Sequence, residues 1–446
     1  MKKVLSSIIL GSILLLNGCS ISKNEIDSKS ENSSENNSVE SNESTNTTLG
    51  YLEKLLRTPK ESKGQASYEC YLSDETFNFM FDLVNRAYTN ENENIALAPV
   101  SVYMALSLAS ECAPLASDTR NEILKCFGYE NNSHGNIEQV KRLYEHLNNS
   151  NKDGMIKELS NSVWLQQGME FNDECLDTLA NDYYCYPFAV DFVNENQLAN
   201  QLMQEFIYEK THHLINLNPQ LKPETLLALM NTLYIKDIWS TNGDLKFSDD
   251  EIKFYNYDGS KKEEKFLLTL YIDGKIYEND LYRSFQAITN SGMKLKVALP
   301  KEGVSVDELF KDNILYDINR IRYQYSDELY EYHTRLELPK FTASYDGELK
   351  GALQDMGIQR LFGPADLSNI CPTTPAAASG VHHVTKYIVD EKGTEGAAVT
   401  IIPEEATSVA PTRRPVYETL LLNKSFVYML TTVADVPLFI GAIKTI

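Results

Sequence analysis

The sequence lacks the features by which many proteins of its length bind nucleic acids or structural metals. Its 41 lysines and arginines are outnumbered by 63 acidic residues, which gives a net charge of −22, and no run is rich in Lys or Arg. Such a chain would repel a nucleic-acid backbone. Its seven cysteines are spread over 446 residues without a CxxC pair. This spacing excludes a disulfide-rich scaffold and argues against a structural zinc site, but it neither pairs the cysteines nor shows that they are free.

The motifs of common enzyme classes are also absent. There is no G-x-S-x-G elbow, no H-E-x-x-H pair, no P-loop and no G-x-G-x-x-G, so no familiar nucleophile–base pair or phosphate cradle is offered. Two adjacent histidine pairs occur, His212-His213 and His382-His383. Neighbours on a strand point to opposite faces, so neither pair readily binds one metal ion. We therefore expect no catalytic residue, no metal and no cofactor.

Long apolar runs are scarce, and one of them begins the chain. Lys2 and Lys3 precede a mostly apolar stretch, Val4–Leu16, which is too short to span a bilayer and is typical of a secretory signal. It ends in L-N-G-C at Cys19, which resembles the lipobox of bacterial lipoproteins, whose cysteine is acylated after cleavage. We predict a signal peptide at residues 1–18 and lipidation of Cys19, with a plain cleaved signal as the alternative. Acyl chains buried at about 0.8 kcal/mol per methylene would hold the protein on the extracytoplasmic face of the cell membrane.

The segment after this signal has little that could form a core. Residues 20–48 are rich in Ser, Asn, Glu and Thr, contain no aromatic residue and have three aliphatic ones. Such a composition predicts disorder, because burial cannot offset the entropy of ordering. As a flexible coil it would reach roughly 30 Å. We therefore predict a tether at 19–50 and one globular domain at 51–446.

Periodicity in the globular part predicts a mixture of helices and strands. Ser73 is a candidate N-cap for an amphipathic helix whose apolar residues recur at helical spacing from Phe77 to Tyr88. The run 226–235 is apolar enough for an element covered on both faces, and Asn231 inside it must find hydrogen-bond partners. A further helix is expected at 349–358, and two strands across 427–443. The order is irregular, which indicates the α+β class.

The segment between Asp390 and Pro415 has an unusual composition. Gly393 and Gly396 make its start a poor helix nucleus and a permissive hinge. Placed in a strand, Thr394, Gly396, Ala398 and Thr400 share one face, and every one of them is small. A face of this kind could slide over a packed core. The alternative is a long exposed connector.

Several separated motifs resemble those of serpins, the serine protease inhibitor superfamily. Residues 391–398, E-K-G-T-E-G-A-A, resemble the hinge E-E/K-G-T-E-A-A-A of inhibitory serpins. Residues 231–239, N-T-L-Y-I-K-D-I-W, resemble N-A-x-Y-F-K-G-x-W, and L-P-K-F at 338–341 is followed by the closing signature at 423–441. The resemblance implies the serpin fold, which is α+β, with three β-sheets, about eight to nine helices and an exposed reactive-centre loop.

The resemblance also assigns roles to individual residues. The implied breach and shutter residues, near which the loop enters the sheet, are Trp239, Ser101, Asn231 and His383. The implied loop hinge consists of Glu391, Gly393, Thr394, Glu395, Gly396, Ala397 and Ala398. The sequence departs from the family pattern at Ala98, where a serine is usual, and at Gly396, where alanine is usual. Pro403 lacks the N–H that a sheet ladder needs, and Glu404 would carry a charge toward the covered side of the sheet.

The function that the resemblance implies is inhibition of serine proteases by a suicide mechanism, without catalysis by the chain itself. A protease cleaves the loop and is acylated, and the freed arm then inserts as a new strand of the main sheet. About ten ladder hydrogen bonds at 0.5–1.5 kcal/mol each would release on the order of 10 kcal/mol. A non-inhibitory serpin that acts as a binding or scaffold module is the alternative.

The cleaved bond is predicted by counting along the loop. Sixteen residues beyond Glu391 lies Thr407, so the bond expected in the family is Thr407–Ser408. Counting back from Phe426 leaves Arg413–Arg414 as the alternative. The small, uncharged Thr407 favours an elastase-like or subtilisin-like protease as the partner, and we expect a monomer that binds no nucleic acid.

Overall fold

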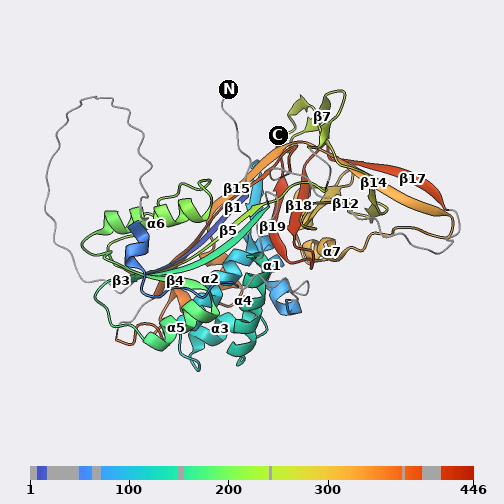
Figure 1. Ribbon diagram of the computed structural model, residues 1–446. Coiled ribbons are helices and arrows are strands. Elements are labelled where there is room, and N and C mark those ends of the chain that lie inside the picture. The colour runs from blue at the N-terminus through green and yellow to red at the C-terminus, as the bar shows by residue number, and fades with distance from the viewer. Residues whose placement is uncertain are drawn as a thin grey trace, which may run out of the picture.

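The computed structural model describes residues 8–17, 50–62, 72–148, 155–240, 244–373, 377–393 and 413–446. Within this part, eight α-helices and three short 3-10 helices pack against β-sheets (Figure 1). The α-helices are α1 (Asp74–Ala87), α2 (Pro99–Cys112), α3 (Asp118–Cys126), α4 (Ser133–Leu147), α5 (Asp173–Asp182), α6 (Asn196–Lys210), α7 (Ile314–Arg320) and α8 (Lys350–Asp355). The 3-10 helices are η1 (Gly50–Lys54), η2 (Val306–Phe310) and η3 (Arg360–Phe362).

A path of twelve hydrogen-bonded strands organises the molecule. In spatial order these are β11 (Tyr277–Glu278), β12 (Tyr282–Ile288), β13 (Lys294–Pro300), β18 (Phe426–Thr431), β19 (Pro437–Ile443), β2 (Ile95–Leu97), β15 (Phe341–Glu348), β16 (Ala377–Val389), β1 (Ile8–Asn17), β5 (Thr225–Lys236), β3 (Ile156–Gln166) and β4 (Cys185–Val190). Its two halves meet at a single pairing between Ser344 of β15 and Ile95 of β2. We call the half from β15 to β4 the main sheet.

A further sheet projects from this body. It contains β10 (Ile272–Asp273), β14 (Tyr330–Leu338), β9 (Leu267–Leu268) and β6 (Lys246–Phe247), with β17 (Arg414–Leu421) parallel to β14. A separate hairpin joins β7 (Ile252–Tyr255) to β8 (Lys261–Glu264). Strands β14 and β17 extend side by side to one end of the molecule (Figure 1). The two halves of the long path and this sheet make up the expected three sheets, and the predicted α+β class is confirmed.

The main sheet has an N-terminal strand at its centre. Strand β1 pairs antiparallel with β5 on one side and with β16 on the other, and Ser12 lies opposite both Asn231 and His383. These ten residues fall within the segment 1–18. That this segment is a signal peptide and is removed stays a prediction. Among the described residues, none of the helices has the length and apolar character needed to cross a membrane.

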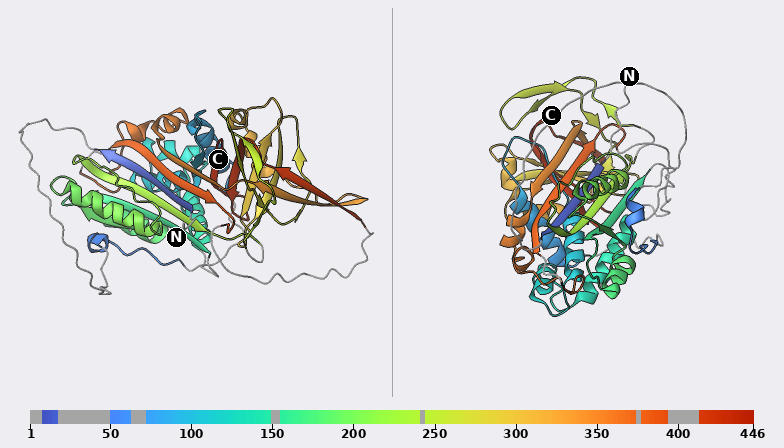
Figure 2. Two further views of the ribbon diagram at one scale, coloured as in Figure 1. Left: turned by 90° about the horizontal axis from the view of Figure 1, so that it is seen from above. Right: turned by 90° about the vertical axis from the view of Figure 1, so that its left-hand side faces the viewer.

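Helices cover both faces of the main sheet. Helix α2 is buried along its whole length and lies against β5, β1 and β19. Helix α6 covers the opposite face (Figure 2). There Phe206 packs on Trp164 and Phe188 of the strands below. The central strands are therefore enclosed by two hydrophobic clusters, as their nearly continuous apolar sequences require.

The predicted elements are found close to their expected places. Helix α1 begins after Ser73, whose side-chain oxygen accepts a hydrogen bond from the Thr76 backbone N–H at 3.1 Å. The apolar run 226–235 is strand β5, and 427–443 contains β18 and β19. The helix expected at 349–358 is shorter, because α8 ends at Asp355 and the chain turns at Gly357, whose φ of 102° favours glycine.

Candidate functional site

The hinge begins where β16 ends, at one end of the strand β1. Gly393 has φ of 84° and forms an isolated bridge with Ile238. A Cβ at this position would lie 2.5 Å from the Trp239 backbone nitrogen. The carbonyl oxygen of Glu391 accepts a hydrogen bond from the Leu245 N–H at 2.7 Å. The described part of the hinge is therefore held closely against the segment that follows β5.

Trp239 anchors this contact from the other side. Its ring is 4% exposed, and its indole N–H donates to the carbonyl oxygen of Asp390 at 2.9 Å. A largely apolar cavity of about 270 Å³ lies beside it, lined among others by Leu270 and Ala287. The residue that follows β16 is thus bonded to a buried ring, which adds to the contacts of Glu391 and Gly393.

A buried carboxylate that the sequence reasoning missed lies next to Trp239. Asp237 is 1% exposed and accepts hydrogen bonds from the Ile238 N–H at 2.9 Å and the Ser291 hydroxyl at 2.5 Å. Burial raises its pKa above the ordinary value, although these hydrogen bonds oppose the rise. The signal was available, because Asp237 stands where the matching motif has glycine.

The middle of the main sheet carries the predicted shutter residues. His383 is completely buried, and its Nε2 accepts a hydrogen bond from the Ala98 backbone N–H at 3.2 Å. Asn231 donates to the Oδ1 of Asn161 at 2.8 Å, while its own Oδ1 has no hydrogen-bond partner among the described residues. The Ser101 hydroxyl, buried in α2, likewise has none within that part of the chain. The motif alone did not indicate Asn161, which lies on the neighbouring strand β3.

The structure thus separates the predicted site residues into two groups. Trp239, Glu391 and Gly393 meet at one end of the main sheet, whereas Asn231 and His383 flank β1 at its middle, on β5 and β16. The predicted residues Thr394, Glu395, Gly396, Ala397, Ala398, Thr407 and Ser408, together with Cys19, Pro403 and Glu404, lie outside the described residues.

The alternative cleavage position lies within the described residues. Arg414 begins β17, and its N–H donates to the Leu329 carbonyl oxygen at 2.9 Å. The Arg413 guanidinium Nε donates to the carbonyl oxygen of Asp327 at 2.8 Å. Arg413 and Arg414, on either side of the alternative cleavage bond, are therefore both hydrogen-bonded to the turn that precedes β14.

The histidine pairs and cysteines have ordinary structural surroundings. His212 contacts Glu158 at 2.9 Å, whereas His213 contacts Glu209 at 3.1 Å, so the two rings face different carboxylates. In the described ranges no group of three or more His, Cys, Asp and Glu side chains is placed to hold a metal ion. The described cysteines are free; they are Cys112, Cys126, Cys175, Cys185 and Cys371.

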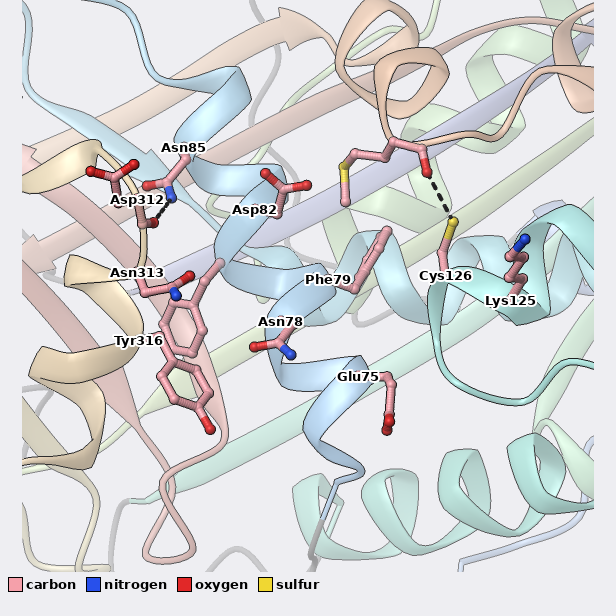
Figure 3. A pocket seen from close by; sticks show the side chains of 12 residues that line it. Glu75, Asn78, Phe79, Asp82, Asn85, Lys125, Cys126, Asp312, Asn313 and Tyr316 are labelled. Atoms are coloured by element: carbon pink, nitrogen blue, oxygen red, sulfur yellow. Dashed lines mark hydrogen bonds between the residues drawn. The ribbon is translucent and has the colours of Figure 1, made fainter.

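A larger cavity of about 470 Å³ lies on the helical side, between α1, α3 and α7 (Figure 3). Carboxylates and aromatic rings line it, and the Asn85 amide donates across it to the Asp312 carbonyl oxygen at 2.9 Å. The Cys126 thiol donates to the Met356 carbonyl oxygen at 3.4 Å, and burial raises its pKa to about 11, which favours the protonated thiol at neutral pH. None of the predicted site residues lines this cavity.

The close contact at Gly393 leads to a prediction about the hinge. We expect Gly393→Ala to lower the melting temperature, because the new methyl group would meet backbone atoms of Ile238 and Trp239. Gly259→Ala is the matched control: Gly259 also has φ of 84°, but nothing lies within 4 Å of its Cβ position. Both variants carry about 1 kcal/mol of backbone strain, because both positions have a positive φ. Only Gly393→Ala adds a close contact with the backbone of Trp239, so only this variant should also change the fluorescence of Trp239. Equal loss of stability in both would contradict the contact.

Burial of His383 predicts loss of stability in acid. Desolvation, with a smaller contribution from His382, lowers the pKa of His383 to about 3. The unfolded chain binds this proton below about pH 6.5, whereas the native chain does not, so stability falls as the pH drops from about 6.5 toward 3. The free energy of unfolding that is lost across this whole pH range is roughly 5 kcal/mol. Urea unfolding of His383→Gln should show a flatter pH dependence over this window, whereas His134→Gln, at an exposed position on α4, should retain it.

Comparison with known proteins identifies relatives along nearly the whole described domain. The family model for "Serpin (serine protease inhibitor)" matches residues 74–445. An uncharacterised serpin-like protein of Methanosarcina acetivorans is 29% identical over 337 residues, which cover 73% of this chain and 76% of that protein. Serpin A3-5 of Bos taurus is 29% identical over 346 residues, covering 75% and 81%.

Solved structures share the fold at lower identity. The native state of tengpin, a thermophilic serpin, superposes with a TM-score of 0.67 at 22% identity and covers 89% of this chain and 98% of its own. Thyroxine-binding globulin in complex with thyroxine gives 0.66 at 22% identity and covers 83% and 98%.

Proposed function

Because the chain belongs to the serpin family, we propose that it inhibits serine proteases as a suicide substrate. In this proposal a target protease cleaves the segment between Gly393 and Arg413 and is acylated, and the freed arm inserts into the main sheet. The chain supplies no catalytic residue, since the nucleophile belongs to the protease. Insertion drags the acylated enzyme along and distorts its active site, and on the order of 10 kcal/mol from new ladder hydrogen bonds makes the trap irreversible.

The observation that carries the proposal is the acceptance of an extra strand between β5 and β16. Strand β1 lies there with ten residues, antiparallel to both neighbours. It runs from the end of β16 next to the hinge, where Ile9 lies opposite Lys386, to the far end, where Asn17 lies opposite Ala377. An arm that turned back at Gly393 would run in this same direction. The position therefore accommodates ten residues of an arm that runs from the hinge in this direction.

The length of β1 also bears on whether Pro403 and Glu404 would hinder insertion of the arm. Ten residues counted from Thr394 end at Pro403. A proline at the last position of the strand would remove one N–H at the end of the ladder and none from its middle. Glu404 would then follow the strand and need not enter the covered part of the sheet.

The N-terminal segment and the arm compete for one position. Cleavage before Cys19, as the lipobox predicts, would remove all of β1 and leave the position empty. We propose that the processed chain, with its lipid on Cys19 and its tether at 19–50, is the inhibitory form on the extracytoplasmic face of the membrane.

The surroundings of Arg413 and Arg414 support Thr407–Ser408 as the cleaved bond. A protease binds its substrate as an extended segment that is free to enter its cleft, but the Arg414 N–H already donates to Leu329. The remaining candidate has a small residue before the bond, which fits an elastase-like or subtilisin-like pocket.

The test uses a chain that begins at residue 19 and carries Cys19→Ser. It is incubated with neutrophil elastase, subtilisin and trypsin, and the products are separated in SDS. Inhibition gives a complex that survives SDS, and sequencing of the released fragment should begin at Ser408. Cleavage of the loop without such a complex would instead favour the alternative, a non-inhibitory serpin that acts as a binding or scaffold module.

A further inference from the structure

Four of the free cysteines meet at the end of α2. Cys112 is the last residue of α2, Cys175 lies in the first turn of α5, Cys185 begins β4, and Cys371 lies between η3 and β16. All four are buried, each with an exposed fraction of at most 3%. We call them the thiol cluster. Four thiols from four separate segments of the chain are thus brought together by folding.

Two members of the thiol cluster are in direct contact. The Cys112 thiol donates a hydrogen bond to the Cys175 sulfur. The Cys175 thiol in turn donates to the carbonyl oxygen of Glu111, the neighbour of Cys112 in α2, at 3.8 Å. A disulfide requires its two sulfurs to lie about 2 Å apart. Thiols that already touch need only a short movement of their side chains to reach this distance.

The backbone on both sides of this pair is held by one loop. The Ile370 N–H donates to the Cys112 carbonyl oxygen at 3.3 Å, and the Asn369 amide donates to the Glu111 carbonyl oxygen at 2.7 Å. At the start of α5, the Asn172 N–H donates to the Ile370 carbonyl oxygen at 3.1 Å. The loop therefore bonds to the last turn of α2 and to the beginning of α5, which keeps the two thiols together in the folded chain.

The other two thiols are neighbours of this pair rather than part of it. Cys185 and Cys371 lie near enough to Cys112 to act on it by charge, whereas the hydrogen bond of Cys112 goes to Cys175. That hydrogen bond and burial raise the pKa of Cys112, and burial raises the pKa of Cys371 to about 12. The thiolate is the reactive form of cysteine, so the cluster reacts slowly once it is buried. Oxidation is therefore expected while the chain folds.

We propose that Cys112 and Cys175 form a disulfide that joins α2 to α5 when the chain folds in an oxidising medium. The predicted export would bring the chain to a compartment of this kind. The oxidant is a small disulfide such as glutathione disulfide. One protein thiolate attacks it, forms a mixed disulfide and releases one glutathione. The second protein thiolate displaces the other glutathione, so two protein thiols and one glutathione disulfide give one protein disulfide and two glutathione thiols.

The disulfide acts as a staple within the main sheet region. Helix α2 lies against the central strand β5, whereas α5 packs on the edge strand β4. The bond closes a loop of roughly 60 residues, which lowers the conformational entropy of the unfolded chain and so favours the folded one. For a domain of this size, the melting temperature of the oxidised chain should lie about 5 °C above that of the reduced chain.

The test refolds the full chain from urea in glutathione buffers of oxidising and of reducing composition. The chain carries Cys19→Ser and Cys70→Ser, so that the five described cysteines are its only thiols. Free thiols are alkylated, and peptides are mapped by mass spectrometry without reduction. We expect the peptides of Cys112 and Cys175 to be linked in the oxidised sample, together with the rise of about 5 °C in melting temperature.

Single variants test the assignment. Cys175→Ala should abolish the difference in melting temperature between the two buffers. Cys126→Ala should retain it, because the Cys126 thiol is bonded to the Met356 carbonyl oxygen, outside the thiol cluster. Each variant is compared with itself in the two buffers, so a general loss of stability caused by the substitution cancels.

Cys371→Ala tests the choice of partner and should keep both the linked peptides and the difference in melting temperature. A link between Cys175 and Cys371 in the parent chain would overturn the assigned pair. Complete alkylation of all five cysteines after oxidising refolding would overturn the disulfide itself. Neither result bears on the proposed inhibition of proteases, which the SDS-stable complex tests separately.

Discussion

The Thr394→Arg variant of the processed chain should be cleaved by the target protease without forming an SDS-stable complex. Thr394 is the first residue of the uniformly small face of the proposed inserting strand. An arginine there would have to enter a face whose residues are all small and uncharged, whereas the opposite face already carries the charge of Glu395. A charged group buried without a partner costs several kcal/mol, which is enough to slow insertion until the acyl bond is hydrolysed. The inhibitor would become a substrate.

Glu395→Arg provides the matched control for this effect. It places the same side chain one residue further along, on the opposite face of the strand, because side chains alternate. Inhibition should survive in Glu395→Arg and be lost in Thr394→Arg, as measured by complex yield and by residual protease activity. Equal behaviour of the two variants would contradict insertion with the small face inward.

Cleavage of the loop in the processed chain should raise the melting temperature by on the order of 10–15 °C. A gain of about 10 kcal/mol, spread over the unfolding entropy of a domain of this size, gives a shift of this magnitude. The reason is that the freed arm fills the position between β5 and β16. Calorimetry of cut and uncut samples measures the difference directly.

The unprocessed chain offers a control that the fold itself suggests. With β1 in place, the position between β5 and β16 is occupied, so cleavage of the same bond should leave the melting temperature unchanged. A processed chain whose melting temperature did not move on cleavage would store no energy in its uncut state, and the trapping mechanism would fail.

The local features of this fold were accessible from the sequence. The cap at Ser73, the buried run of β5 and the strands β18 and β19 were predicted because each depends on neighbouring residues and on a regular apolar period. The hinge motif likewise directed attention to Gly393 and Trp239, which the structure brings together. The end of α8 was predicted less well, since helix ends depend on the competition between one more turn and the local backbone of Gly357.

Contacts between distant segments were beyond reach of the same reasoning. The hydrogen bond between Asn231 and Asn161 joins two strands 70 residues apart, and the bonds of Arg413 and Arg414 to the turn before β14 span more than 80 residues. No periodicity encodes which strands become neighbours. The departure of Asp237 from the motif was visible in the sequence, but its burial was not, because its hydrogen-bond partner Ser291 lies 54 residues further along the chain.

The amino-acid sequence by itself determined the family and the small side chains that alternate in the segment after Gly393, since each is a property of consecutive residues. Only the tertiary structure decided that residues 8–17 lie between β5 and β16, and that Arg413 and Arg414 are hydrogen-bonded to the turn before β14. Such outcomes depend on strand register and on long-range packing, where the free energy comes from segments that meet only after folding.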